Sequence, residues 1–303
     1  MSSSISPLPP TVQRILNIYL NNLPAVFATR YVAAAALVIV LYDWLLNLGD
    51  EVRLIYPGRR SMVKMLYIII RVSTLIGLIV VNYRLAGFRP PLSNFLMSIL
   101  IPTLQILVIA ISNFLLMRRV GPLYGNSWKV VYGLHFLFLI SYVATIALSM
   151  DLILGLLPGT RYDPLSDCCF TLSTPTRPIA IIYLGPLLLE TVVFLMTMYK
   201  AYKAARSTAA MPRILQVFFR DGLIHYFGML TVRVFCIVIT FELPLAYGLL
   251  GVYLLWAIVT TMTTRLFINF RAVGNKEVEA TWGNLPSSDE ASELRGREPR
   301  VPV

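Results

Sequence analysis

The residues that could do chemistry in this 303-residue chain are few, because only 14% of its residues are charged. The most informative are the ionisable side chains that interrupt long apolar stretches. They are Asp43, Arg71, Glu190, Arg220, Asp221, His225 and Arg233. An ionisable group inside a bilayer is costly, so each must be neutralised by a partner or serve a function. These residues are therefore the candidate ligand or ion-pair sites.

Two pairs among them lie at matching depths. Asp43 is about five residues from the inner end of the first apolar run and Arg71 about seven from the start of the second, so we expect a structural ion pair. Glu190 and Arg233 lie within reach of each other on the fifth and sixth runs. Structural pairing of Glu190 and a role as a proton or cation site both remain open.

A third group gathers at the inner end of the sixth run. Asp221 and His225 are four residues apart, which places them on one helix face beside Arg220. This group either couples the chain to a cytosolic partner or anchors the helix at the lipid headgroups, and we favour anchoring.

Catalytic and metal-binding motifs do not occur in the sequence. No phosphate-binding glycine loop, nucleophile elbow or zinc-protease motif is present. Two histidines and three scattered cysteines do not have metal-ligand spacing. We therefore expect no enzyme activity, no metal and no cofactor.

The cysteines favour a different use. Cys168 and Cys169 precede the fifth apolar run, in a long segment expected outside the membrane, and Cys236 lies near the outer end of the sixth run. An oxidising face permits a disulfide from Cys168 or Cys169 to Cys236.

The elements that must position these residues are long apolar helices. Hydrophobic residues make up 57% of the chain, and a helix crosses the hydrocarbon core with about 20 apolar residues. The seven candidate spans are residues 26–48, 64–83, 90–117, 130–150, 179–199, 217–240 and 243–264. We expect kinks at Pro102 and Pro186. The fold class is all-α: a polytopic membrane protein with seven transmembrane helices.

Three regions follow from this pattern. Residues 1–25 form an outer N-terminal segment, in which residues 12–23 show the i, i+3, i+4 pattern of an interfacial helix. Residues 26–270 form the seven-helix domain. Residues 271–303 combine dense charge with Gly, Pro and Ser, which predicts a disordered cytoplasmic tail.

The net charge of +11 reflects topology. With the N-terminus outside, 17 of the 26 lysines and arginines fall in inner segments and 6 in outer ones. Basic residues concentrate on the cytoplasmic side, so we expect the N-terminus outside and the C-terminus in the cytoplasm. The partners are then the lipid bilayer and, at the inner loops and tail, a possible cytosolic protein, with no nucleic acid. The location is the plasma membrane or an endomembrane.

Residues 30–72 resemble the N-terminal domain of unknown function that opens a large family of fungal, mostly basidiomycete, seven-helix membrane proteins. The resemblance rests on Tyr42 and Asp43, on the Asp-Glu-Val-Arg run of residues 50–53, and on Lys64 and Arg71. Residues 119–124, 220–222 and 265–269 and Glu190 resemble the family more weakly. The resemblance implies that residues 26–83 are this family domain. It also implies a receptor-like topology with no established activity.

We expect a receptor-like, sensory or signalling membrane protein. Span three ends in Met-Arg-Arg at residues 117–119, without the acidic-Arg-Tyr motif of rhodopsin-class receptors, so any coupling uses other residues. A small-solute or proton carrier or channel, with Glu190, Arg233 and Asp43 along a polar path, is one alternative. A structural membrane protein without a ligand is another.

Overall fold

The computed structural model describes residues 9–57, 61–86, 94–156, 160–163, 168–171, 181–206, 213–243 and 247–283. Within them are seven long helices and a short hairpin. The helices are α1 (Pro10–Leu54), α2 (Met62–Leu85), α3 (Asn94–Leu123), α4 (Trp128–Leu156), α5 (Ile181–Arg206), α6 (Arg213–Glu242) and α7 (Gly248–Gly283). Strands β1 (Thr160–Asp163) and β2 (Cys168–Thr171) pair antiparallel between α4 and α5.

All seven helices are long and apolar enough to cross a membrane, which confirms the predicted helical class and the seven spans. Their outer surface is apolar as well: Val38, Leu139 and Leu188 are each more than half exposed. A soluble protein rarely exposes a continuous belt of such residues, whereas lipid covers it favourably. The chain is therefore an integral membrane protein.

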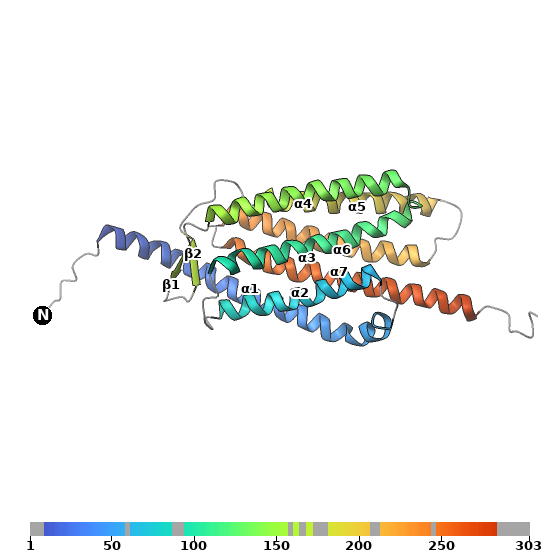
Figure 1. Ribbon diagram of the computed structural model, residues 1–303, viewed down its shortest axis with the longest axis horizontal. Coiled ribbons are helices and arrows are strands. Elements are labelled where there is room, and N and C mark those ends of the chain that lie inside the picture. Colours follow the sequence, from blue (N-terminus) through green and yellow to red (C-terminus); the bar gives the residue numbers. More distant parts are fainter. Residues whose placement is uncertain are drawn as a thin grey trace, which may run out of the picture.

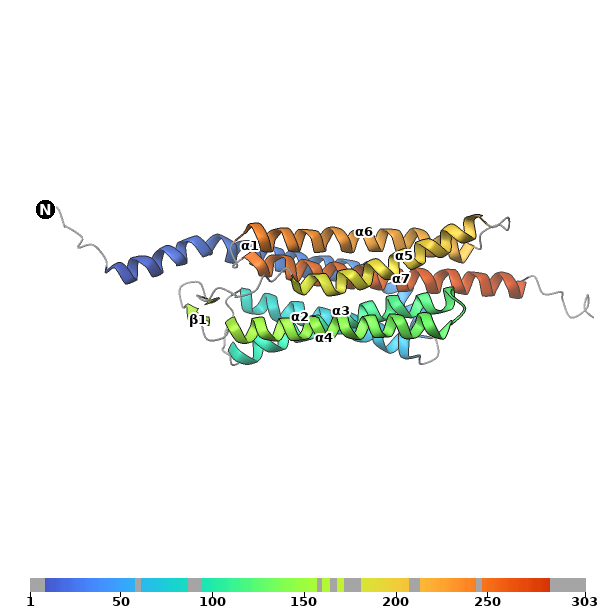
Figure 2. The ribbon, with the colours of Figure 1, turned by 90° about the horizontal axis from the view of Figure 1, so that it is seen from above.

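The helices lie side by side along the long axis of the molecule (Figure 1). We name the two ends of this bundle by α7: at the C-terminal end α1, α3, α5 and α7 finish and α2, α4 and α6 begin. The hairpin of β1 and β2 lies at the opposite end of the bundle (Figures 1 and 2).

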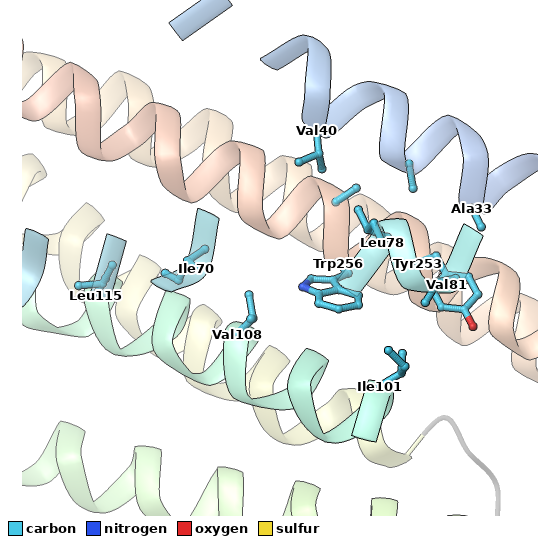
Figure 3. Packing of buried hydrophobic residues seen from close by; sticks show 12 residues of the cluster. Ala33, Val40, Ile70, Leu78, Val81, Ile101, Val108, Leu115, Tyr253 and Trp256 are labelled. Carbon is cyan, nitrogen blue, oxygen red and sulfur yellow. The ribbon is translucent and has the colours of Figure 1, made fainter. Parts of the chain in front are cut away.

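Helix α7 is the central element. It packs against α1, α2, α3 and α6, and 61% of its membrane-spanning window is buried, more than in any other described helix. Trp256 of α7 is fully buried and lies among Leu78 of α2 and Val108 of α3 (Figure 3). This ring needs Gly77 opposite it, because a Cβ at that position would collide with the indole.

Two boundaries differ from the sequence expectations. Residues 12–23 do not form a separate interfacial helix, since α1 runs without a break through Pro24. Helix propagation gains a hydrogen bond per residue, and one proline without a second breaker does not stop it. The stretch before the bundle therefore continues the first span and projects beyond the other helices (Figure 1).

At the other terminus, helix α7 continues to Gly283, well into the segment expected to be disordered. Residues 271–283 contain the helix formers Ala, Glu and Lys and no proline, so the preceding helix propagates through them. The rest of the predicted tail, residues 284–303, lies outside the described residues. Pro102 and Pro186 lie inside α3 and α5, which continue past both.

Candidate functional site: two buried polar networks and a cavity

The first polar network joins α1, α2 and α7. The Arg71 guanidinium lies 2.7 Å from Asp43 Oδ2 through Nη1 and 2.7 Å from Glu51 Oε1 through Nη2. Tyr67 Oη donates a hydrogen bond of 2.5 Å to the same Glu51 oxygen. Arg265 Nε of α7 donates to Asp43 Oδ1 at 2.5 Å. The ion pair expected between Asp43 and Arg71 is thus present, within a larger set of groups.

Helical spacing explains why these side chains meet. Asp43 and Glu51 are eight residues apart on α1, so they share one face, and Asn47 between them donates to Asp43 Oδ1 at 3.0 Å. Tyr67 and Arg71 are four apart on α2 and face that stripe. Two carboxylates and two guanidinium groups leave the network neutral, which makes its burial tolerable.

The exposure of the network is uneven. The Asp43, Glu51 and Arg71 side chains are at most 7% exposed, whereas that of Arg265 is 52% exposed. Arg265 therefore reaches from the surface of α7 to a buried carboxylate on α1. The sequence analysis did not make Glu51 and Arg265 candidate site residues, because each falls just beyond a predicted span. The spacing of Glu51 from Asp43 could have placed both carboxylates on one helix face.

The second polar network joins α3, α4, α5 and α6. Arg233 holds the Glu190 carboxylate with two hydrogen bonds, Nε to Oε2 at 2.9 Å and Nη2 to Oε1 at 2.6 Å. Asn113 Nδ2 lies 2.9 Å from Glu190 Oε1 and 2.8 Å from Tyr142 Oη. Arg233 is 1% exposed and Glu190 6%. The structure brings the expected partners Glu190 and Arg233 together, and it adds an amide and a phenol that no charge pattern indicated.

The two networks divide the seven helices into two groups. The first network connects α1, α2 and α7, and the second connects α3, α4, α5 and α6. The groups meet where α3 packs against α2 and α7 and where α6 packs against α7. Along α6 and α7 the packing is apolar, with Met229 and Cys236 beside Leu255 and Val259. Gln105 Nε2 of α3 also donates to the Val252 carbonyl of α7 at 2.9 Å, toward the end opposite the C-terminal end.

A cavity of about 50 Å³ lies where the two groups meet, in the half of the bundle toward the C-terminal end. Its walls come from α3, α5, α6 and α7. The polar residues of the walls are Asn113, Arg119, Glu190, Thr197 and His225. Most of the others are apolar, and the stacked rings of Phe194 and Tyr226, 3.8 Å apart, form the wall between α5 and α6.

Arg119 is the unusual residue of this cavity. Its Nη1 and Nη2 atoms are buried and have no hydrogen-bond partner within the described part of the chain. The guanidinium lies 4.7 Å from the centre of the Phe270 ring of α7, a cation–π contact across the two helix groups. Sequence reasoning placed Arg119 in an inner loop, used it for topology and for the weaker family resemblance, and did not make it a candidate site residue, yet α3 continues to Leu123.

Of the three residues expected to cluster at the start of span six, the structure describes the side chain of His225. His225 is 5% exposed and lines the cavity, so it does not anchor α6 at the headgroups. A ring placed on the inward face of the helix cannot reach them. Arg220 and Asp221 belong to α6, but their side chains lie outside the described residues.

The disulfide that the sequence permits at Cys236 is not formed. This residue is a buried free thiol, packed so closely on Gly251 that a Cβ there would lie 2.7 Å from its Sγ. The side chains of Cys168 and Cys169, on β2, lie outside the described residues. No group of three or more His, Cys, Asp or Glu residues is placed to hold a metal ion in the described parts of the chain.

Comparison with known proteins adds a match over part of the chain. Residues 31–76 match a family of unknown function (DUF6533). The match covers parts of α1 and α2 and includes Asp43, Glu51, Tyr67 and Arg71, so most of the first network lies within it. No curated protein and no solved structure matches this chain.

Proposed function

We propose that this chain is a receptor-like membrane protein that signals by shifting its two helix groups against each other. The observation that carries this proposal is the partition of the buried ion pairs: each ion pair lies within one of the two groups, while α6 and α7 meet through apolar packing beside a cavity. Loss of one partner of a buried ion pair lowers the stability of the folded protein by about 3–5 kcal/mol. Apolar packing has no such directional requirement, and packed helices can slide by small shear movements.

The exposed position of Arg265 supports an output at the C-terminal end. Its ion pair with Asp43 connects α7 to α1, yet half of its side chain is exposed, so another protein can compete with Asp43 for it. We propose that this end faces the cytosol, where a protein partner that engages Arg265 would release α7 from α1. The concentration of lysine and arginine in the segments at this end supports that orientation.

The carrier alternative has less support from the site. It needs Glu190 to release a proton or an ion and to accept another. Both of its carboxylate oxygens instead accept hydrogen bonds, from Arg233 and Asn113. A carboxylate held in this way behaves as a structural anchor.

Proximity labelling from a fused C-terminus tests the proposal in cells. We would compare the full-length chain with Arg265→Gln, which removes the contact with Asp43. Arg53→Gln is the matched control, since Arg53 is an exposed arginine at the same end of the bundle. We expect at least one soluble protein to be labelled above a single-span anchor that carries the same enzyme, and its labelling to change several-fold only in Arg265→Gln. Labelling identical to the anchor for all three chains would overturn the proposal.

A further inference from the structure

We propose that the cavity between α3, α5, α6 and α7 is a binding site for an anionic amphiphile, whose phosphate or carboxylate pairs with Arg119 while its apolar chain lies along the cavity wall. This inference concerns binding and does not depend on whether the chain signals.

The balance of charge around the cavity supports an anionic ligand. Two charged residues with described side chains line it, Glu190 and Arg119. Glu190 is neutralised by the two hydrogen bonds from Arg233. Arg119 has no such compensation, because its buried terminal nitrogens have no hydrogen-bond partner in the described residues. A buried guanidinium without a counter-charge is unfavourable, and an anion would remove that penalty.

The shape of the Arg119 side chain suits an oxyanion. A guanidinium presents its two terminal nitrogens as a planar fork that matches the oxygens of a carboxylate or phosphate. The Phe270 ring covers one face of this plane at 4.7 Å. A ligand would therefore meet the edge of the plane, where Nη1 and Nη2 lie. His225 lines the same cavity from α6 and supplies further ring nitrogens.

The apolar walls require that the ligand be an amphiphile. Val193, Phe194, Leu223 and Met229 lie along the cavity, so a hydrated inorganic ion would have to lose water against hydrocarbon. A volume of about 50 Å³ exceeds the space of roughly 10–15 Å³ that a single water needs on a comparable measure. It is enough for a small headgroup or a few methylenes.

The depth of Arg119 fits a lipid-like molecule. Arg119 is four residues before the end of the span Ile99–Leu123, which is about 6 Å along the helix axis. This depth is close to the headgroup layer, although the terminal nitrogens of Arg119 are buried in the cavity. Basic pockets between helices near that layer are typical sites for acidic lipid headgroups. The site thus lies where a headgroup and its first methylenes are found.

Binding is tested on the purified full-length chain in a neutral detergent. The probes are phosphatidic acid, oleate, phosphatidylcholine with the same acyl chains as the phosphatidic acid, and inorganic phosphate. Lipid retention is read by native mass spectrometry, and affinity by the shift in melting temperature. We expect phosphatidic acid, oleate or both to raise the melting temperature, with no shift from phosphatidylcholine or inorganic phosphate. A shift in melting temperature from inorganic phosphate alone would refute the need for an apolar chain. Equal shifts from both phospholipids would refute the need for a negative charge.

Two variants locate the site. Arg119→Gln should weaken binding of the anionic probe at least tenfold, and its neighbour Arg118→Gln, exposed on the same helix, should leave binding unchanged. Without ligand, Arg119→Gln should melt at a higher temperature than the native chain, because it removes an uncompensated buried charge. Equal losses in both variants, or binding retained in Arg119→Gln, would overturn the assignment.

A second test fills the cavity without altering any charge. Gly222 lines the cavity, and a Cβ built there has no neighbour within 4 Å. Gly222→Leu should therefore keep the fold, since leucine favours helix more than glycine does. It should also lower the retention of the anionic probe severalfold. Unchanged retention in Gly222→Leu would place the ligand elsewhere on the protein.

Discussion

Replacing Glu190 by glutamine would leave Arg233 in the protein interior without its counter-charge. The carboxylate accepts two hydrogen bonds from Arg233 and one from Asn113, and Arg233 is 1% exposed, so water cannot take its place. Glutamine has one oxygen and no charge, and it therefore keeps at most part of this set. Breaking one partner of a buried pair destabilises by about 3–5 kcal/mol. At roughly 2–4 °C per kcal/mol for a domain of this size, we expect the melting temperature to fall by roughly 6–20 °C.

The double variant separates the loss of the pair from the loss of packing. Glu190→Met with Arg233→Met replaces both ionic groups by apolar side chains of similar length. Exchange of a whole buried pair for apolar residues is often neutral or stabilising. We therefore expect the double variant to melt well above Glu190→Met or Arg233→Met alone, with a loss far smaller than the sum of the two single losses of about 3–5 kcal/mol each. The measurement is thermal unfolding of the purified full-length chain in one detergent. A fall below about 1 kcal/mol for Glu190→Gln, or strictly additive single losses, would refute the reasoning.

Three further predictions use other parts of the molecule. Arg71→Ala removes the buried partner of Asp43 and Glu51 and should destabilise the protein by about 3–5 kcal/mol. Arg265→Ala changes a half-exposed position and should destabilise it by about 1 kcal/mol or less. Thermal unfolding of both variants measures this order, and equal losses would contradict it. Gly77→Ala forces a Cβ into the Trp256 ring and should destabilise by about 1–3 kcal/mol, while Gly49→Ala, with open space around it, should not. With the C-terminal end in the cytosol, protease added to sealed, right-side-out vesicles should spare a C-terminal epitope tag and remove it only after permeabilisation; removal in intact vesicles would invert the orientation.

The seven spans could be predicted because bilayer thickness translates directly into the length of an apolar run. The pair of Asp43 with Arg71 followed from matching depths, and Glu190 with Arg233 from mutual reach. Glu51 and Arg265 escaped because span ends were placed at the last strongly apolar residue, although the helices continue past it.

The cavity could not be derived from the sequence. Its position depends on how α3, α5, α6 and α7 pack, and no periodicity within one helix records the contacts of four. Arg119 adjoins Arg118 in the sequence, and both were assigned to a loop. In the structure Arg118 is exposed, whereas Arg119 faces Phe270. Which of two adjacent arginines points inward depends on the rotation of the helix. The ends of α1 and α7 were also misjudged from the sequence. Local composition indicated a separate helix before the first span and a disordered tail after the last, but both helices continue through these residues.

Helix α7 is longer than the membrane is thick. Its 36 residues give about 54 Å at 1.5 Å per residue, against a hydrocarbon core of about 30 Å. Roughly 24 Å of the helix therefore lies outside the hydrocarbon core. A tilt of about 10° around the membrane boundary would carry its tip through roughly 4 Å. The contacts of α7 with α1, α2, α3 and α6 set its angle, so any change in those contacts inside the bilayer would also displace the part of α7 that lies outside it.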